Sequence, residues 1–418
     1  MLHSGTIITL ILLSISFLIA LIFTSWKFFR NKKIVKLILI FSLISFSASS
    51  FELVHHIFKK NRLYADIKES SQVLGELFYD RYPLLIGNSM YIISSIKNND
   101  KYASYNDNRA LNDNVKKESE GYSPTIILVL GESSYNGRYS SYGYEKITTP
   151  NIQRIFSANN GGCIVNDAIS PAPITRDSLA ITLSFISPDN NNKLFNEKSI
   201  IDMAGDNGYK TYWLSSQNIN GLYSSKYGYI AKQSDVVEFS DWSDDKLPEM
   251  LDSTLNENSD KKFIVIHLHG SHLPYKNFDN TDAEALKSDD YDLTIHHTDR
   301  VINEIYQVAG RKTGSFVILY TSDHGEIVGE GHGLRKGKEQ YEIPLMAVSN
   351  NSQSNTCDLI ESYRNNNGYL NGNSNKYIIS ELIGYSVDPA SKQKTKNDNS
   401  ILTANEDVID YDEYKKLK

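Results

Sequence analysis

The segment Phe316-Val-Ile-Leu-Tyr320 is an apolar run that leads directly into Thr321-Ser-Asp-His-Gly-Glu326. A short apolar run bounded by polar residues is typical of a buried β-strand. Two other apolar runs end in polar residues in the same way: Thr125-Ile-Ile-Leu-Val-Leu-Gly-Glu132 and Phe263-Ile-Val-Ile-His-Leu-His-Gly-Ser-His272. These runs alternate with helical patterns, which predicts an α/β fold with parallel strands.

The polar residues at these three strand ends indicate a metal site. In open α/β sheets, ligands bind in the crevice beyond the carboxyl ends of the strands. A single acidic residue there is explained by helix capping, but three strands delivering carboxylates and imidazoles together are not. The residues concerned are Glu132, His272, Asp323 and His324. Such a ligand set suits Zn²⁺, with Mn²⁺ as the second choice.

Thr175 is the candidate nucleophile. It lies in Pro171-Ala-Pro-Ile-Thr-Arg-Asp-Ser-Leu179, a turn-rich entry to a helical stretch. The simpler interpretation is that Thr175 caps this helix. A helix N-terminus also presents N–H groups to an anion such as phosphate, and a threonine hydroxyl bound to zinc is a competent nucleophile. Local sequence leaves both interpretations open.

Composition and charge exclude some classes of protein. The chain has 418 residues and a net charge of −7, and this charge disfavours a nucleic-acid partner, which requires clustered Lys and Arg. Its two cysteines, Cys163 and Cys357, are too few for a cysteine-rich metal site. They could form one disulfide or none, since spacing alone does not decide this.

The N-terminal region predicts a membrane anchor. Residues 6–26 contain no charge and are long enough to span a bilayer as a helix. A cleaved signal peptide is the alternative, but no basic segment precedes the run and no small-residue cleavage site follows it. Residues 34–54 form a second apolar stretch, whose serine content also permits a buried amphipathic helix. Five cations between Lys27 and Lys36 predict that the intervening loop is cytoplasmic.

These observations give a domain layout for the chain. Residues 1–58 are expected to form the two-helix transmembrane anchor. Residues 59–121 are expected to form membrane-surface helices followed by a polar linker. Residues 122–390 would then be the catalytic domain, and residues 391–418 a polar C-terminal tail.

A set of motifs between about residues 123 and 350 resembles the phosphoethanolamine transferases of the alkaline phosphatase and sulfatase superfamily. No single motif is decisive, but their order along the chain is the order in that family. The motifs are Val129-Leu-Gly-Glu132-Ser-Ser134, Tyr142-Gly-Tyr144, Thr148-Thr-Pro-Asn151, Thr175 with Ser178-Leu179, Gly208-Tyr-Lys-Thr-Tyr-Trp213, His269-Gly-Ser-His272 with Pro274-Tyr275, Tyr291-Asp292, Thr298-Asp299, Ser322-Asp-His-Gly-Glu326, Gly331-His-Gly333 and Ile343-Pro-Leu345.

The resemblance implies roles for individual residues. Glu132, Thr175, Asp323 and His324 match the positions that hold the catalytic zinc. Thr175 also matches the residue that accepts the phosphoethanolamine group. Two histidines match positions that contact the transferred phosphate or hold a second metal: His272 and His332. Four other histidines are expected to be structural: His267, His269, His296 and His297.

The resemblance also implies a fold, an activity and a location. The fold would be an alkaline phosphatase-like sandwich, with a central, mostly parallel sheet flanked by helices, preceded by the transmembrane anchor. The activity would move phosphoethanolamine from phosphatidylethanolamine to a lipopolysaccharide acceptor through a phosphothreonine intermediate. The enzyme would be anchored in a bacterial inner membrane, in contact with its lipids, with the catalytic domain in the periplasm. Members of the family usually have five transmembrane helices, whereas two are visible here.

Two other kinds of enzyme and an inactive scaffold are the alternatives to this hypothesis. A sulfatase makes its formylglycine from Cys in a Cys-x-Pro-x-Arg setting, which Cys163-Ile-Val-Asn-Asp167 does not match. A phosphoglycerol transferase, or another metal-dependent phosphodiesterase, differs in a head group that sequence patterns read only weakly. A membrane-tethered scaffold without activity would require the loss of at least one of the four zinc-site residues, and all four are present.

Overall fold

The computed structural model describes residues 108–186, 193–220, 224–351, 355–405 and 407–417, together with residues 40, 88, 89, 92 and 93. The predicted membrane spans, 6–26 and 34–54, lie outside these residues apart from residue 40. Among the residues that are described, no helix combines the length and apolar character needed to cross a membrane. The chain divides into two compact units, Met1–Ser104 and Tyr105–Lys418, and the fold below is that of the second.

The centre of the second unit is a seven-stranded sheet with the order β3-β9-β8-β2-β7-β5-β6. The strands from β8 to β6 are parallel, whereas β9 is antiparallel to both β8 and β3. The sheet is therefore mixed, with a mostly parallel body as expected. Its strands are β2 (Thr125–Gly131), β3 (Gly162–Ile164), β5 (Lys210–Ser215), β6 (Val236–Phe239), β7 (Lys262–His267), β8 (Phe316–Ser322) and β9 (Leu345–Ser349).

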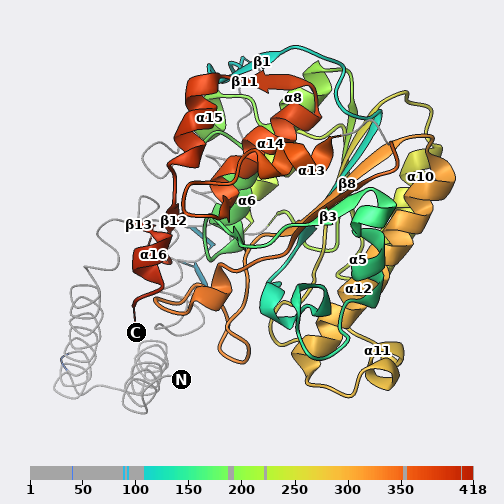
Figure 1. The fold of residues 1–418 in the computed structure, drawn as a ribbon, viewed down its shortest axis with the longest axis vertical. Coiled ribbons are helices and arrows are strands. Elements are labelled where there is room, and N and C mark those ends of the chain that lie inside the picture. Colours follow the sequence, from blue (N-terminus) through green and yellow to red (C-terminus); the bar gives the residue numbers. More distant parts are fainter. Residues whose placement is uncertain are drawn as a thin grey trace, which may run out of the picture. The chain divides into compact units, whose positions relative to one another are not determined.

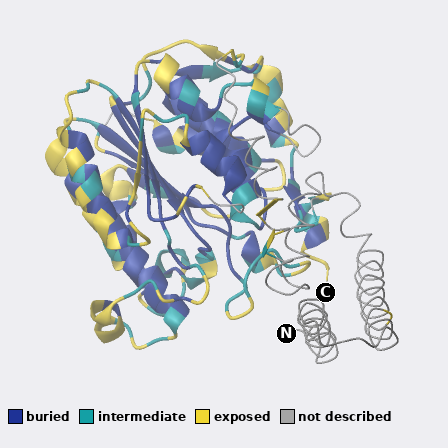
Figure 2. Cartoon of the chain, turned by 180° about the vertical axis from the view of Figure 1, so that it is seen from behind, coloured by how far each residue is buried: buried dark blue, intermediate teal, exposed yellow. Residues whose placement is uncertain are grey.

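Helices cover both faces of the sheet (Figure 1). One layer contains α5 (Pro150–Ile155), α10 (Leu247–Asn256) and α12 (Asp290–Lys312). The other contains α6 (Thr175–Leu183), α8 (Ile200–Asp206), α13 (Thr356–Glu361) and α14 (Asn375–Leu382). Helix α9 (Ser225–Ala231) packs against α6. Figure 2 shows the strands buried between the two helical layers, with exposed residues on the outer helices. Every residue of β2, β7 and β8 is buried, which explains why these strands are continuous apolar runs in the sequence.

Strand register brings the polar strand ends together. Along β2, Leu130 pairs with Thr321 of β8 on one side and with His267 of β7 on the other. The three strands therefore end level with one another. The residues that follow them, including Glu132 and Asp323, leave the sheet at the same edge.

The folded unit extends beyond both boundaries expected from the sequence. Within the expected linker, β1 (Val115–Lys117) pairs with β11 (Tyr385–Val387). The expected C-terminal tail contains most of α15 (Pro389–Lys396), then β12 (Ser400–Leu402), β13 (Val408–Asp410) and α16 (Tyr411–Tyr414). Tyr411 and Tyr414 are buried against Tyr341. A few aromatic residues thus anchor a segment whose composition is polar.

Cys163 and Cys357 form a disulfide that joins β3, at the edge of the sheet, to α13. This decides the question that sequence spacing left open. The bond closes a loop with a sequence separation of 194 residues, and closing a long loop restricts the unfolded chain.

Replacing both cysteines by serine is expected to lower the free energy of unfolding by about 2–4 kcal/mol. Chemical denaturation of the variant and the wild type measures this difference. A reducing agent should lower the midpoint of the wild type and leave that of the variant unchanged. Equal midpoints for the two oxidised proteins would contradict the expected contribution.

Candidate metal centre

Four of the residues expected to hold a metal meet at the carboxyl edge of the sheet. Glu132 directly follows β2, Asp323 and His324 directly follow β8, and Thr175 is the first residue of α6. Glu132, Asp323 and His324 are buried, whereas Thr175 is partly exposed. A hydroxyl at the open side of a buried ligand cluster can be reached by a substrate.

The polar atoms of these four side chains converge. Thr175 Oγ1 lies 3.1 Å from Glu132 Oε2 and 3.1 Å from His324 Nε2. His324 Nε2 lies 3.4 Å from Glu132 Oε1 and 3.2 Å from Asp323 Oδ2. Glu132, Asp323 and His324 each place a ligand atom within 4.8 Å of those of the other two.

Thr175 does not cap helix α6. The N-cap of α6 is Ile174, and no side chain caps this helix end. The Thr175 hydroxyl instead points to Glu132 and His324.

The chemistry of the donor set fits a divalent metal ion. Asp323 Oδ2 is buried and has no hydrogen-bond partner among the described residues, which is costly for a carboxylate oxygen. His324 Nδ1 lies 2.8 Å from the carbonyl of Gly325, and this contact assigns the ring proton to Nδ1. Burial lowers the pKa of His324 to about 3, so its Nε2 carries a lone pair at neutral pH. This is the arrangement of a metal-ligating histidine.

Burial and neighbouring groups shift the pKa values of both carboxylates. Burial raises the pKa of Asp323, and the nearby charge of Glu132 raises it further. Burial also acts to raise the pKa of Glu132, but the imidazoles of His324, His272 and His332, in their protonated forms, outweigh this effect and lower it. A bound divalent cation would allow both carboxylates to ionise.

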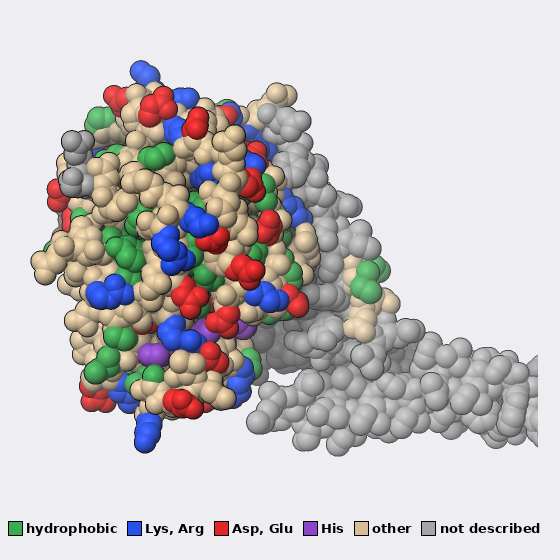
Figure 3. All heavy atoms as spheres, turned by 90° about the vertical axis from the view of Figure 1, so that its right-hand side faces the viewer, with side chains coloured by type: hydrophobic (Ala, Val, Ile, Leu, Met, Phe, Trp, Pro, Cys, Tyr) green, Lys and Arg blue, Asp and Glu red, His purple; other side chains and the backbone are tan. Residues whose placement is uncertain are grey.

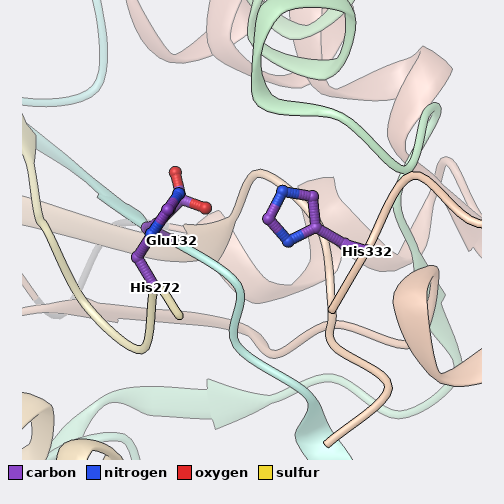
Figure 4. Close-up of side chains that lie close together, drawn as sticks. All are labelled: Glu132, His272 and His332. Atoms are coloured by element: carbon purple, nitrogen blue, oxygen red, sulfur yellow. The ribbon is translucent and has the colours of Figure 1, made fainter. Parts of the chain in front are cut away.

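His272 and His332, to which the resemblance assigns a phosphate contact or a second metal, lie beside this cluster. Figure 4 shows Glu132, His272 and His332 approaching one another from three separate segments, and their ligand atoms lie within 4.8 Å of one another. The rings of His324 and His332 are 4.1 Å apart between centroids. Burial acts to lower the pKa of His332, but the hydrogen bond with Glu326 raises it above its ordinary value.

Three further residues at the site received no role from the sequence. Glu326 Oε2 lies 2.9 Å from His332 Nδ1, and Gln217 Nε2 donates to Glu132 Oε2 at 3.0 Å. Ser178 Oγ donates to the carbonyl of Asp323 at 2.5 Å. Gln217 follows β5, which is parallel to β7 and ends at the same edge, so the strand-end pattern could have identified it.

None of the histidines expected to be structural belongs to the groups of ligand atoms around Glu132 and His324. His267 is buried beside Gln217, and His269 stacks on His272. His296 and His297 contact Asp282 at 2.7 and 3.1 Å. The Asp279, Asp282 and His297 side chains could also hold a cation by spacing, but the Arg300 guanidinium already pairs with Asp282 at 2.8 Å. That group is therefore an ion-pair network.

One face of the folded unit carries mixed charge. On the face shown in Figure 3, acidic and basic side chains are interspersed, with histidine side chains visible among them. This distribution differs from the continuous basic surface that nucleic-acid binding requires.

Comparison with solved structures gives the class of fold. The fold is similar to that of the C-terminal periplasmic domain of EcEptC from Escherichia coli, in complex with Zn (TM-score 0.59, 22% identity, 72% of this chain and 97% of that chain). It is shared with the integral membrane protein lipooligosaccharide phosphoethanolamine transferase A (EptA) from Neisseria meningitidis (TM-score 0.57, 18% identity, 88% and 73%). It also matches a protein in the alkaline phosphatase superfamily from Vibrio parahaemolyticus (TM-score 0.50, 14% identity, 69% and 74%). The fold is thus the expected alkaline phosphatase-like α/β fold.

Sequence comparison gives the family. The model of the sulfatase family matches residues 124–381, which is more than half of the chain, and the chain belongs to this family. The resemblance drawn from the ordered motifs is confirmed. Similar proteins include phosphoethanolamine transferase EptC of E. coli K12 (29% identity, 53% of this chain and 43% of the relative) and phosphoethanolamine transferase EptA of Helicobacter pylori (29%, 54% and 47%). The chain spans about half the length of the curated relatives it matches.

Proposed function

We propose that this protein transfers phosphoethanolamine from phosphatidylethanolamine to a lipopolysaccharide sugar, with Thr175 carrying the group between the two. The observation that carries the proposal is the position of the Thr175 hydroxyl, 3.1 Å from both Glu132 and His324 and beside an unpartnered oxygen of Asp323. The names of the similar proteins, phosphoethanolamine transferases EptC and EptA, support the choice of head group.

Glu132, Thr175, Asp323 and His324 would hold the metal, for which Zn²⁺ is the first choice and Mn²⁺ the second. When bound, zinc would lower the pKa of a coordinated hydroxyl and polarise a phosphate oxygen. The remaining chemistry belongs to the protein. His272 and His332, on the open side of Glu132, would contact oxygens of the transferred phosphate or hold a second metal ion.

The transfer takes two steps. Thr175 Oγ1 forms a bond to the donor phosphorus, and the bond from phosphorus to the diacylglycerol oxygen breaks, so that diacylglycerol leaves with a proton. The acceptor oxygen then attacks the same phosphorus and loses its proton, and the Thr175 hydroxyl is restored. Both reactants use the same open side, which leads to ping-pong kinetics.

The disulfide supports a periplasmic location for the folded unit. Disulfides persist in oxidising compartments, of which the bacterial periplasm is one. With residues 6–26 and 34–54 as membrane spans and a cytoplasmic loop between them, the catalytic unit would face the periplasm, anchored in the inner membrane.

Mass spectrometry of lipopolysaccharide from cells with and without the intact gene tests the proposed function. We expect a phosphoethanolamine increment that requires the gene and that disappears in a Thr175→Ala strain. A phosphoglycerol increment instead would assign the alternative head group. Identical lipopolysaccharide and glycan masses in the two strains would refute the proposal.

Ser178 is expected to act as a positioning residue. Its hydroxyl and that of Ser170 both donate to the Asp323 carbonyl at 2.5 Å, which fixes the backbone that presents Asp323 and His324. Ser178→Ala should lower kcat by about tenfold with KM nearly unchanged, because the displaced ligands affect the transition state more than substrate binding.

Steady-state kinetics of Ser178→Ala and of a matched control test this role. The control is Ser184→Ala, because the Ser184 hydroxyl, just after the same helix, donates to the Ala180 carbonyl and reaches no residue of the site. Ser178→Thr should recover part of the activity, since it keeps the donor. Equal kcat values for the two alanine variants would argue against a positioning role.

A further inference from the structure

A cavity lies at the other end of α6 from Thr175. It has a volume of about 440 Å³ and is lined in part by Phe185 and Ile186, which follow α6, and by Lys376 and Tyr377 of α14. The nine residues of α6 rise about 13 Å, so the cavity is separate from the candidate metal centre. Its volume is in the range of small-molecule binding sites.

Lys376 is a buried cation with little compensation. The residue is 7% exposed, and its Nζ has one hydrogen bond, at 3.4 Å to the carbonyl of Ile186. No carboxylate in the described part of the chain lies within ion-pair distance of this ammonium group. Burial lowers the pKa of Lys376 to about 8, so the amine is still largely protonated at neutral pH. An anion in the cavity would stabilise this charge.

The rest of the lining also favours an anion. Lys193 and Lys394 join Lys376 around the cavity, against the single carboxylate of Asp398. The Lys193 ammonium group forms an ion pair with the Glu197 carboxylate at 3.2 Å. The Asp398 carboxylate accepts hydrogen bonds from the Ser400 backbone N–H and the Asn373 side-chain amide. The cavity therefore has an excess of positive charge.

The neutral part of the lining suits a sugar ring. Phe185 and Tyr377 form an edge-to-face aromatic pair with ring centroids 5.8 Å apart, which offers an apolar surface to the C–H groups of a sugar. Side chains that can bond to sugar hydroxyls surround it, and they include Asn112, Asn114, Asn373, Ser391, Thr395 and Asn397. Apolar faces combined with a few convergent polar groups are typical of ligand sites.

We propose that this cavity binds a monosaccharide phosphate, with the Lys376 ammonium on the phosphate and the Phe185–Tyr377 pair against the sugar ring. The lysines supply the affinity for the phosphate, and the amides and hydroxyls bind the ring. The proposal is independent of the transferase activity, because it uses no residue of the candidate metal centre.

Isothermal titration calorimetry on the full chain tests it with glucose 6-phosphate, glucose and inorganic phosphate as separate probes. We expect one saturable site for glucose 6-phosphate, at least about tenfold tighter than for glucose or phosphate alone, as expected when two subsites contribute. Lys376→Met, which keeps the length of the side chain and removes its charge, should weaken this binding at least tenfold. Asp323→Asn, in the candidate metal centre, should leave it unchanged.

Lys394→Gln is the second variant, to be used if Lys376→Met does not fold. Lys394 is exposed on α15, so its substitution should not disturb the fold. This variant should weaken binding of glucose 6-phosphate about threefold or more, as loss of one partly exposed charge contact would. Equal binding of inorganic phosphate and glucose 6-phosphate would overturn the sugar assignment. Loss of binding in Asp323→Asn, unchanged binding in both lysine variants, or no saturable binding would overturn the site.

Discussion

Thr175→Ala is expected to abolish transfer, with a loss of at least about 10⁴-fold in kcat, the order observed when a covalent nucleophile is removed. Among the described residues, the Thr175 hydroxyl is the one that hydrogen-bonds to the side chains of both Glu132 and His324, whereas the Ser133 hydroxyl reaches only Glu132 of this pair. The fold should be kept, because Thr175 does not cap α6 and its side chain is partly exposed. Thr175→Ser should retain part of the activity, since it keeps the hydroxyl.

Mass spectrometry of the wild type, incubated with phosphatidylethanolamine and no acceptor, gives the direct measurement. We expect a phosphoethanolamine adduct on the peptide that contains Thr175, and none in Thr175→Ala. Ser184→Ala serves as the matched control, as its hydroxyl is turned to its own helix. Transfer at the wild-type rate by Thr175→Ala, with no adduct in either protein, would mean that the acceptor attacks the donor directly.

Asp323→Asn is expected to remove metal binding together with activity. In the metal-free protein the substitution should cost little stability or even raise it, because Asp323 and Glu132 are buried carboxylates and Asp323 Oδ2 has no partner. Zinc should stabilise the wild type, since a ligand that binds only the folded state raises its unfolding temperature. The variant should show no such increase.

Calorimetry with and without zinc, combined with metal analysis, separates these effects. Asp358→Asn is a suitable control, because Asp358 is exposed on α13 and belongs to none of the groups of ligand atoms. The control should bind one equivalent of zinc and gain the same stability as the wild type. Stoichiometric zinc and full activity in Asp323→Asn would remove Asp323 from the ligand set.

The sequence predicted the sheet and its carboxyl edge because these depend on local patterns. Each central strand is a buried apolar run, and a polar residue marks where it ends. Glu132, Asp323 and His324 were identified from that pattern, and the structure brings them together. The antiparallel pairing of β9 with β8 was not predicted, because strand direction depends on the path of the connecting chain.

The residues that sequence reasoning missed act through tertiary contacts. Ser178 binds a carbonyl 145 residues away, and Gln217 binds Glu132 across 85 residues. Gln217 could have been recognised from its place after β5, but no local pattern distinguishes Ser178 from a serine on the surface. The same holds for Tyr411 and Tyr414, whose partner Tyr341 is distant in the chain. Their segment was therefore interpreted as a tail from its polar composition.

The level ends of β2 and β8 make the ligand cluster sensitive to changes in chain length. Gly131 pairs with Ser322, so Glu132 and Asp323 are the next residues on their two strands. Deleting one residue within either strand would shift its end by about 3.3 Å and turn each side chain beyond the deletion to the opposite face of the sheet. Length variation in this protein should therefore be tolerated in the outer connections and excluded from these two strands.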